Sequence, residues 1–207
     1  MYKKAKITRK GLYRQYFKRL LDFFVSLILI LVLFLPGIII AILIKVSAPR
    51  EPIFFRQERV GKNGIDFQIY KFRTMSSQAP HAVATEDFYH PMQYITPVGS
   101  FLRRTSIDEL PQLLNVLKGE MSIIGPRPLI PTEKLVLNQR QQLGADKALP
   151  GITGLAQISG RDELSGAKKA ELDADYVKHL SAKLDLQILL KTIAVVLFQK
   201  GFHEGKG

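Results

Sequence analysis

The feature that most constrains this chain is an uncharged apolar run of 22 residues, from Phe23 to Ile44. At about 1.5 Å per residue, a helix of this length matches the roughly 30 Å of hydrocarbon in a bilayer. The run is too long for the apolar part of a signal peptide, and no small-residue cleavage site follows it. The sequence therefore predicts a membrane-associated segment over residues 1–48 and a domain outside the membrane over residues 49–207.

A Pro-Gly pair interrupts the run, and basic residues flank it on both sides. Proline at Pro36, followed by Gly37, removes a backbone hydrogen bond and kinks a helix. Residues 1–19 carry eight Lys or Arg and no acid, and residues 45–73 carry seven against three acids. A spanning helix should show its positive excess on the cytoplasmic side only. Two basic flanks therefore favour a re-entrant helix that breaks at Pro36 and returns to the same anionic leaflet. A single ordinary span is the alternative.

The whole chain is basic, with 30 Lys plus Arg against 18 Asp plus Glu and a formal net charge of +12. This charge favours polyanionic partners, which are nucleic acids, anionic lipid headgroups or phosphorylated substrates. The adjoining apolar run favours lipid over nucleic acid. Because the chain has no cysteine, disulfides, thiolate metal sites and a cysteine nucleophile are excluded.

Residues 105–128, TSIDELPQLLNVLKGEMSIIGPRP, form the most informative stretch outside the apolar run. A capping box of Ser106 and Glu109, leucines at helical spacing and a Lys-Gly stop predict a short helix. Asp108 and Glu109 then lie in its first turn, where free amides favour anions. As capping or dipole-complementing acids, the two carboxylates would need no catalytic role. After the helix, Arg127 lies between two prolines, and a rigidly mounted arginine suits phosphate recognition.

The remaining elements are a hairpin and three helices. Residues Ile53–Phe72 alternate around a Gly-Lys-Asn-Gly turn, which predicts a β-hairpin. It leads into Lys71 and Arg73, for which a solvated strand edge is the plain explanation. Asp173 flanks the buried line of a predicted helix, where an acid is usually a solvated neighbour. The three helices are predicted over residues 132–142, 167–180 and 184–198, and the last has a wide apolar face that suits the core or the membrane interface.

The segments KFRTM, SFLRRTSIDELPQLLNVLKGEMSIIGPRP and PGITGLAQISGR together resemble the bacterial sugar transferase family, the monotopic polyprenyl-phosphate phosphoglycosyl transferases. The resemblance covers nearly the whole chain. Because only a short stretch follows the last predicted helix, the chain resembles the small members of the family. It implies an α+β fold: a helix-rich monotopic membrane protein with an N-terminal re-entrant, Pro-broken helix, a β-hairpin and amphipathic interfacial helices. It also implies that residues 49–207 form a catalytic domain on the cytosolic face of the bacterial cytoplasmic (inner) membrane.

The resemblance implies an activity. Such enzymes transfer a sugar 1-phosphate from a UDP-sugar to a polyprenyl phosphate, such as undecaprenyl phosphate, and release UMP. This is the first membrane step in making a capsule, an exopolysaccharide or a glycoprotein glycan. By position, Asp108 matches the nucleophile that forms an aspartyl phosphosugar, and a carboxylate with an ordinary pKa of about 3.9 needs no general base. The partners implied are the UDP-sugar, the polyprenyl phosphate, anionic lipids and downstream glycosyltransferases, without nucleic acid.

The resemblance also assigns the other site residues. Glu109 matches the second acid of the pair and Asp173 a further acid, both near Mg²⁺, which would neutralise the diphosphate. The positions matched to phosphate and nucleotide binding are Arg103, Arg127, Arg161, Lys71 and Arg73. One departure concerns the helix break, where several relatives have Ser-Pro and this chain has Leu35 before Pro36. The kink therefore depends on Pro36, Gly37 and the basic anchoring on both sides of the apolar run.

Two other functions stay open on the sequence. A non-catalytic basic membrane scaffold would bind anionic surfaces in a salt-dependent way and would not need Asp108. An aspartyl phosphohydrolase would use the same carboxylate with water as acceptor and would release sugar phosphate without any lipid.

Overall fold

The computed structural model describes residues 9–80, 90–160 and 163–198. Its elements are, in order, α1 (Arg9–Leu12), the π-helical turn η1 (Tyr13–Phe17), α2 (Lys18–Ser47), β1 (Phe54–Val60), η2 (Lys62–Gly64), β2 (Asp66–Phe72), η4 (Pro91–Gln93), α3 (Pro97–Arg104), η5 (Ile107–Gln112), α4 (Leu113–Lys118), β3 (Ser122–Ile124), α5 (Lys134–Leu143), η6 (Ala145–Lys147), β4 (Gly151–Thr153), α6 (Leu155–Ser159), α7 (Gly166–His179) and α8 (Ala182–Leu197). The described residues are thus helix-rich with two small sheets, which confirms that part of the predicted fold.

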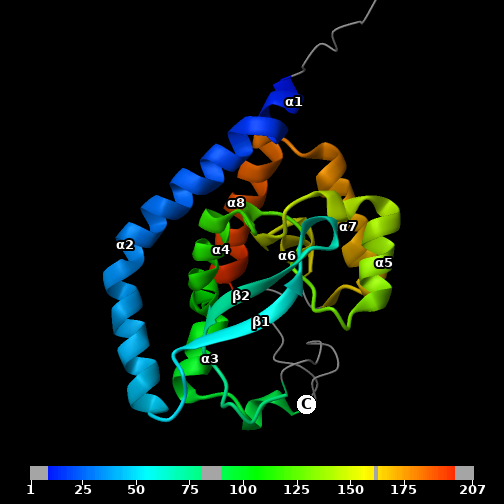
Figure 1. The fold of residues 1–207 in the computed structure, drawn as a ribbon. Coiled ribbons are helices and arrows are strands. Elements are labelled where there is room, and N and C mark those ends of the chain that lie inside the picture. Colours follow the sequence, from blue (N-terminus) through cyan, green and yellow to red (C-terminus); the bar gives the residue numbers. More distant parts are fainter. Residues whose placement is uncertain (1–8, 81–89, 161–162, 199–207) are drawn as a thin grey trace, which may run out of the picture.

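Helix α2 carries the apolar run and arches along one side of the molecule (Figure 1). Together with η1 it forms Tyr13–Ser47, the one helix in the described ranges that is long and apolar enough to cross a membrane. The helix does not end at Pro36, and Figure 1 shows it bent along its length. The predicted break is therefore a bend, because a proline removes one backbone bond while the turns on either side keep theirs.

Both ends of α2 are attached to the same body of the protein. Near the N-terminal end, Asp22 accepts a hydrogen bond of 2.7 Å from the Ser122 hydroxyl on β3. Near the C-terminal end, Ile44 is 3% exposed and packs with Phe72 and Leu102. Between these ends, apolar side chains project away from the body, and the most exposed are Leu31, Val32, Phe34 and Leu35. The helix is therefore anchored by polar contacts at one end and by apolar packing at the other.

The predicted hairpin is confirmed. Strands β1 and β2 pair antiparallel from Phe54 opposite Phe72 to Val60 opposite Asp66. Positive φ at Asn63 (56°) and the following glycine closes the turn, as short hairpin turns require. Side chains of β2 pack on α4 and on the end of α2. The hairpin thereby carries the end of its second strand to the base of α4.

The second sheet is a short parallel pair, in which Ser122 lies opposite Gly151 and Ile124 opposite Thr153. The two backbone segments approach each other closely just beyond this sheet. A Cβ atom at Gly151 would lie 2.0 Å from the Gly125 amide nitrogen, so only glycine fits there. The glycine-dense segment after Pro150 therefore serves a backbone-to-backbone approach.

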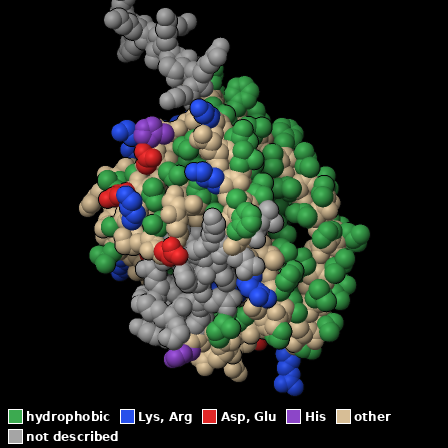
Figure 2. Space-filling model, turned by 180° about the vertical axis from the view of Figure 1, so that it is seen from behind, with side chains coloured by type: hydrophobic (Ala, Val, Ile, Leu, Met, Phe, Trp, Pro, Cys, Tyr) green, Lys and Arg blue, Asp and Glu red, His purple; other side chains and the backbone are tan. Residues whose placement is uncertain are grey.

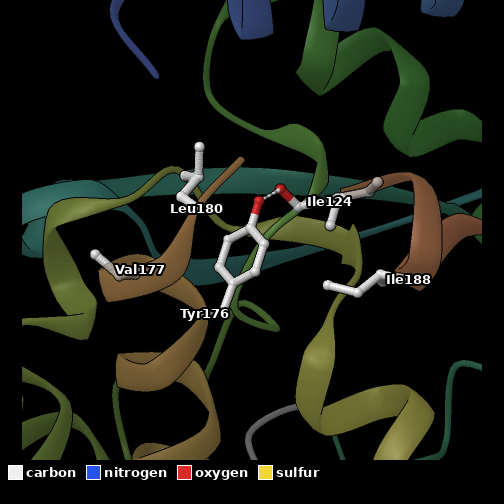
Figure 3. Packing of buried hydrophobic residues seen from close by; sticks show 5 residues of the cluster. All are labelled: Ile124, Tyr176, Val177, Leu180 and Ile188. Atoms are coloured by element: carbon white, nitrogen blue, oxygen red, sulfur yellow. Dashed lines mark hydrogen bonds between the residues drawn. The ribbon is translucent and has the colours of Figure 1, made fainter. Parts of the chain in front are cut away.

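The three predicted helices beyond the hairpin are confirmed as α5, α7 and α8, each within two residues at either end. Helices α7 and α8 close the core against β3 (Figure 3). Tyr176 of α7 is 1% exposed and donates a hydrogen bond of 2.9 Å to the Ile124 carbonyl oxygen. Ile188 of α8 is fully buried beside it, whereas the outer face of α8 exposes Leu186, Leu189, Leu190 and Ile193. Because β3 leads directly into the loop that carries Arg127, this core supports that loop.

Candidate active site

The carboxylates Asp108 and Glu109 lie on the 3-10 segment η5. The predicted capping box is wrong, because Ser106 lies in the left-handed region (φ 56°, ψ 17°) and its side chain caps no amide. The Glu109 amide donates instead to the Ser106 carbonyl oxygen (3.2 Å). The Glu109 side chain points elsewhere, because the Lys71 ammonium binds it at 2.7 Å. The stretch does end at Gly119 (φ 89°), as predicted.

Three cations from three different elements surround the two carboxylates. Lys71, at the end of β2, lies 2.7 Å from Glu109 Oε1 and 4.0 Å from Asp108 Oδ2. Arg127, in the loop after β3, places Nη1 3.6 Å from the same Glu109 oxygen. Arg103, in the last turn of α3, donates from Nη1 to a methionine sulfur at 3.5 Å, and its buried Nε has no hydrogen-bond partner in the part of the chain that the structure describes. Sequence segments more than 50 residues apart thus meet at one point.

The charge balance at Asp108 sets its protonation. Asp108 is 8% exposed, and burial raises its pKa to about 6. The negative charge of Glu109 adds to this rise, whereas Lys71, Arg103 and Arg127 oppose it. At neutral pH the carboxylate is therefore mostly ionised, although it is nearly removed from water. A weakly solvated anion among cations can act as a nucleophile toward a phosphorus atom whose oxygens those cations bind.

Arg127 is mounted on a rigid loop. Prolines on both sides restrict its backbone, and each carbonyl oxygen over residues 126–129 accepts a hydrogen bond. The donors, in chain order of the carbonyls, are the Gly151 amide (2.8 Å), the Arg140 guanidinium (2.7 Å), the Arg59 guanidinium (3.0 Å) and the Val60 amide (2.9 Å). The loop is therefore held at every residue while the Arg127 side chain stays 39% exposed.

Two predicted site residues, Arg73 and Asp173, do not join this group. Arg73 donates to the Pro52 carbonyl oxygen (3.0 Å) and lies 3.8 Å from Glu51. Asp173 is 1% exposed and pairs with Arg140 at 2.5 Å, so the alternative of a solvated neighbour is wrong. Arg161 lies outside the described residues. Among those that are described, no group of three or more His, Cys, Asp or Glu could hold a metal ion.

Two residues near the site have no prediction from the sequence. Arg59 of β1 lies close enough to Arg127 and Glu109 to interact with both, and burial followed by the Arg127 charge lowers its pKa to about 10. Arg140 of α5 is 7% exposed. Arg59 Nη2 donates a hydrogen bond of 2.5 Å to Gln57 Oε1, two residues earlier on the same strand. Two polar residues at i and i+2 share one face of a strand, and this pair was the one sign in the sequence that Arg59 has a structural role. Arg140 sits in a polar helix, where its sequence neighbours give no sign of burial.

The chain is similar to proteins of known family. Residues 13–199 match the family described as bacterial sugar transferase. An uncharacterized sugar transferase, EpsL, from Bacillus subtilis (strain 168) is 44% identical over 153 residues, 74% of each chain. The exopolysaccharide production protein ExoY of Rhizobium meliloti (strain 1021) is 36% identical over 189 residues, 84% of this chain and 82% of that protein.

A longer relative covers the same region. The UDP-glucose:undecaprenyl-phosphate glucose-1-phosphate transferase of Xanthomonas campestris pv. campestris is 42% identical over 171 residues, which are 78% of this chain and 34% of that protein. The match to residues 13–199 includes α2, the carboxylates Asp108 and Glu109, and α8. The chain therefore belongs to the bacterial sugar transferase family, as its motifs predicted.

Proposed function

We propose that this protein transfers a sugar 1-phosphate from a UDP-sugar to a polyprenyl phosphate, with Asp108 as the nucleophile. The observation that carries the proposal is the buried Asp108 carboxylate with Lys71, Arg103 and Arg127 acting on its charge. Cations placed around an attacking group neutralise phosphate oxygens as charge builds up during phosphoryl transfer. The names of two relatives support the substrate class: the Xanthomonas transferase above and an undecaprenyl-phosphate galactose phosphotransferase of Salmonella typhimurium.

The proposed reaction has two displacement steps. In the first, an Asp108 carboxylate oxygen attacks the sugar-linked phosphorus of the donor, and the bond from that phosphorus to the bridging oxygen breaks. UMP leaves with the electron pair, and an aspartyl phosphosugar remains. In the second, a phosphate oxygen of the polyprenyl phosphate attacks the same phosphorus, and the bond to Asp108 breaks. The carboxylate is restored, so no proton is gained or lost overall and no general base is needed.

The residues beside Asp108 have distinct proposed roles. Lys71 contacts both carboxylates and orients them while it offsets their charge. Arg127, whose side chain is partly exposed, can contact donor phosphate from the open side with its planar fork. Arg103, whose charge lowers the pKa of Asp108, has a buried Nε donor without a partner among the described residues. A diphosphate would thus meet cations on several sides.

Mg²⁺ is the proposed cofactor. Magnesium is usually held by one or two carboxylates together with substrate phosphates, so the adjacent carboxylates of Asp108 and Glu109 fit it although no cage of three acids exists in the described part of the chain. Glu109 would hold the ion, which would supply charge neutralisation at the diphosphate. The prediction that Asp173 also holds it stays untested, and the Arg140 ion pair already engages that carboxylate.

The proposal includes a re-entrant geometry for α2 at the cytoplasmic membrane, with the active site on the cytosolic face. Its support is that Asp22 and Ile44, near opposite ends of the apolar helix, both contact the same body. A straight span would carry these ends to opposite faces of the bilayer. Figure 2 shows hydrophobic side chains gathered along one side of the molecule, over α2. The exposed apolar face of α8 would lie in the interface of the same leaflet, near anionic headgroups.

Thiol labelling tests this geometry. The chain has no cysteine, so Gln15→Cys and Arg50→Cys each introduce one thiol next to an end of the apolar helix. In intact cells, neither variant should react with an impermeant maleimide until the membrane is opened. Labelling of one position from outside would establish a single span.

Intact mass spectrometry tests the chemistry. The purified protein is mixed with Mg²⁺ and each member of a panel of UDP-sugars, without lipid, beside Asp108→Asn. We expect an adduct of one phosphosugar in the wild type only, which polyprenyl phosphate then removes as lipid diphosphate sugar. Release of sugar phosphate without lipid would indicate a phosphohydrolase. Vesicle binding with neither adduct nor UMP on any donor would indicate a scaffold.

The lipid-linked product would serve as the primer for glycosyltransferases that extend a capsule or exopolysaccharide. Two relatives of this chain are named for exopolysaccharide production. Named relatives act with glucose or galactose, so UDP-glucose and UDP-galactose are the first donors to test.

A further inference from the structure

The backbone of the Arg127 loop is held by two arginine side chains, Arg140, which is buried, and Arg59, which is half-buried. Arg140 Nη1 donates to the Arg127 carbonyl oxygen at 2.7 Å, and Arg59 Nη1 donates to the Pro128 carbonyl oxygen at 3.0 Å. Flanking backbone amides hold the carbonyls on either side of this pair. Two of the four contacts that fix this loop therefore come from long, intrinsically flexible side chains, which must themselves be held.

Asp173 holds one of these arginines. Its carboxylate, 1% exposed on α7, lies 2.5 Å from Arg140 Nη2, and Arg140 itself is 7% exposed on α5. The planar guanidinium thus spans two partners, the Asp173 carboxylate through Nη2 and the Arg127 carbonyl through Nη1. Only a fork of donors in fixed geometry can make both contacts at once. A continuous chain of polar contacts leads from α7 through α5 to the residue that faces Glu109.

The ion pair is poorly explained as a source of stability. Burial raises the pKa of Asp173 to about 6, and the Arg140 charge only partly offsets that rise. A buried pair whose desolvation outweighs its attraction adds little net stability, and apolar residues of similar size would pack as well. The geometry of the guanidinium, which reaches the loop, is the property that apolar residues could not supply.

We infer that Asp173 and Arg140 are positioning residues for Arg127, setting where its guanidinium meets the phosphates of the donor. The inference rests on the proposed function for its kinetic part but not for its structural part. Asp173 acts here through Arg140, and not as a ligand of the metal ion. Arg59 donates in the same way to the next carbonyl oxygen, that of Pro128, and completes the side-chain contacts that fix the loop.

Three variants separate positioning from metal binding. Arg140→Lys keeps the positive charge opposite Asp173 but loses the fork, so the fold survives while the Arg127 carbonyl contact is lost. Asp173→Asn removes the charge that orients Arg140. Glu171→Gln is the matched control, because Glu171 lies on the same helix two residues away, is exposed and pairs with the exposed Lys168 at 2.9 Å.

Hydrogen–deuterium exchange of the full-length protein in detergent measures how firmly the Arg127 loop is held, and it does not depend on catalytic turnover. We expect peptides covering residues 124–131 to exchange at least tenfold faster in Arg140→Lys and Asp173→Asn than in wild type or Glu171→Gln. Unchanged exchange in both site variants would overturn the inference, even if no UDP-sugar proves to be a substrate and the proposed function fails.

Steady-state kinetics test how the loss of these contacts changes KM for the UDP-sugar donor. We expect KM for the UDP-sugar to rise about tenfold or more in Arg140→Lys, with the Mg²⁺ concentration for half-maximal rate unchanged within about twofold. In an Arg127→Ala background, Asp173→Asn should add less than about twofold, because both changes remove the same contact. A tenfold higher Mg²⁺ requirement in Asp173→Asn, or full additivity with Arg127→Ala, would assign Asp173 to the metal instead and overturn the inference.

Discussion

Two buried aspartates in this protein share their burial and their pKa but differ in their surroundings. Asp108 in η5 and Asp173 in α7 are 8% and 1% exposed, and burial raises the pKa of each to about 6. Asp173 forms a close ion pair with the Arg140 guanidinium, at 2.5 Å. Among the described residues, the cation nearest to Asp108 is the Lys71 ammonium at 4.0 Å, which binds Glu109 more closely, at 2.7 Å.

The difference separates a carboxylate that can react from one that supports. Asp173 is 1% exposed and already lies against the Arg140 guanidinium, so it cannot approach a phosphorus atom without leaving that ion pair. Several cations at longer range stabilise the charge of Asp108 and leave its oxygens accessible to a substrate. Burial and a raised pKa therefore mark both residues as unusual, and partner geometry distinguishes their roles.

The largest expected effect is on transfer itself. Asp108→Asn should lower the rate of UMP release by at least about 1,000-fold, because the amide cannot form the phosphosugar bond. The same change at Asp173 should leave measurable turnover. Quantifying UMP under identical donor and Mg²⁺ concentrations checks the contrast. Turnover by Asp108→Asn comparable to that of Asp173→Asn would remove the distinction between the two aspartates.

The two substitutions should also change stability in opposite directions. Asp173→Asn leaves the buried Arg140 charge without its partner and should lower the free energy of unfolding by about 3 kcal/mol. Asp108→Asn removes a buried charge and should raise it by about 1 to 3 kcal/mol at pH 7.5. Denaturant titrations of the purified variants in detergent measure both. A destabilised Asp108→Asn would show that the surrounding cations hold that carboxylate more tightly than its raised pKa implies.

The stability gain from Asp108→Asn should depend on pH. Because the folded pKa of about 6 lies above the ordinary value, the folded state binds a proton more readily than the unfolded state. The contribution of Asp108 is therefore fully present at low pH and is lost as the pH rises through 6. Wild type and Asp108→Asn should have similar stability near pH 4 and diverge by pH 7.5.

Activity should have an acid limb that belongs to Asp108. Below pH 6, the rate of adduct formation should fall about tenfold per pH unit as the nucleophile is protonated. Asp173→Asn should keep this limb at a lower overall rate, since the nucleophile is unchanged. Stopped-time intact mass spectra between pH 4.5 and 8 give the rates. Loss of the limb in Asp173→Asn would place the essential titration in the Arg140 pair.

The smallest expected effect sharpens the role of Lys71. Its charge lowers the pKa of Asp108, so Lys71→Met should move the midpoint of the acid limb upward by about one pH unit. The rate will also fall because Lys71 contacts both carboxylates, so the midpoint is the informative quantity. An unchanged midpoint would mean that Arg103 and Arg127 dominate the field at Asp108.

Much of the fold was predictable because local patterns specify it. The hairpin follows from alternation around a glycine turn, and α5, α7 and α8 follow from helical spacing. The capping box failed because a side chain can serve only one partner, and Lys71, which is 38 residues away in sequence, binds Glu109 in the folded protein. The residues next to Glu109 in the sequence cannot show that Lys71 will bind its side chain.

The functional residues divide in the same way. Asp108, Glu109, Lys71, Arg103 and Arg127 stand in recognisable motifs, and the structure places them together. Arg140 and Arg59 carry no motif signal, because their importance comes from carbonyl oxygens contributed by another segment. The ion pair of Asp173 required the structure for the same reason, since its partner Arg140 lies on a different helix.

The sequence alone identifies the family, the apolar helix and the two acids of the site, because these depend on composition and on residues close together in the chain. The tertiary structure decides which carboxylate is already paired, how the Arg127 loop is held, and that both ends of α2 contact the same body. Those properties depend on distances between segments far apart in the chain, and such distances exist only after the segments have packed.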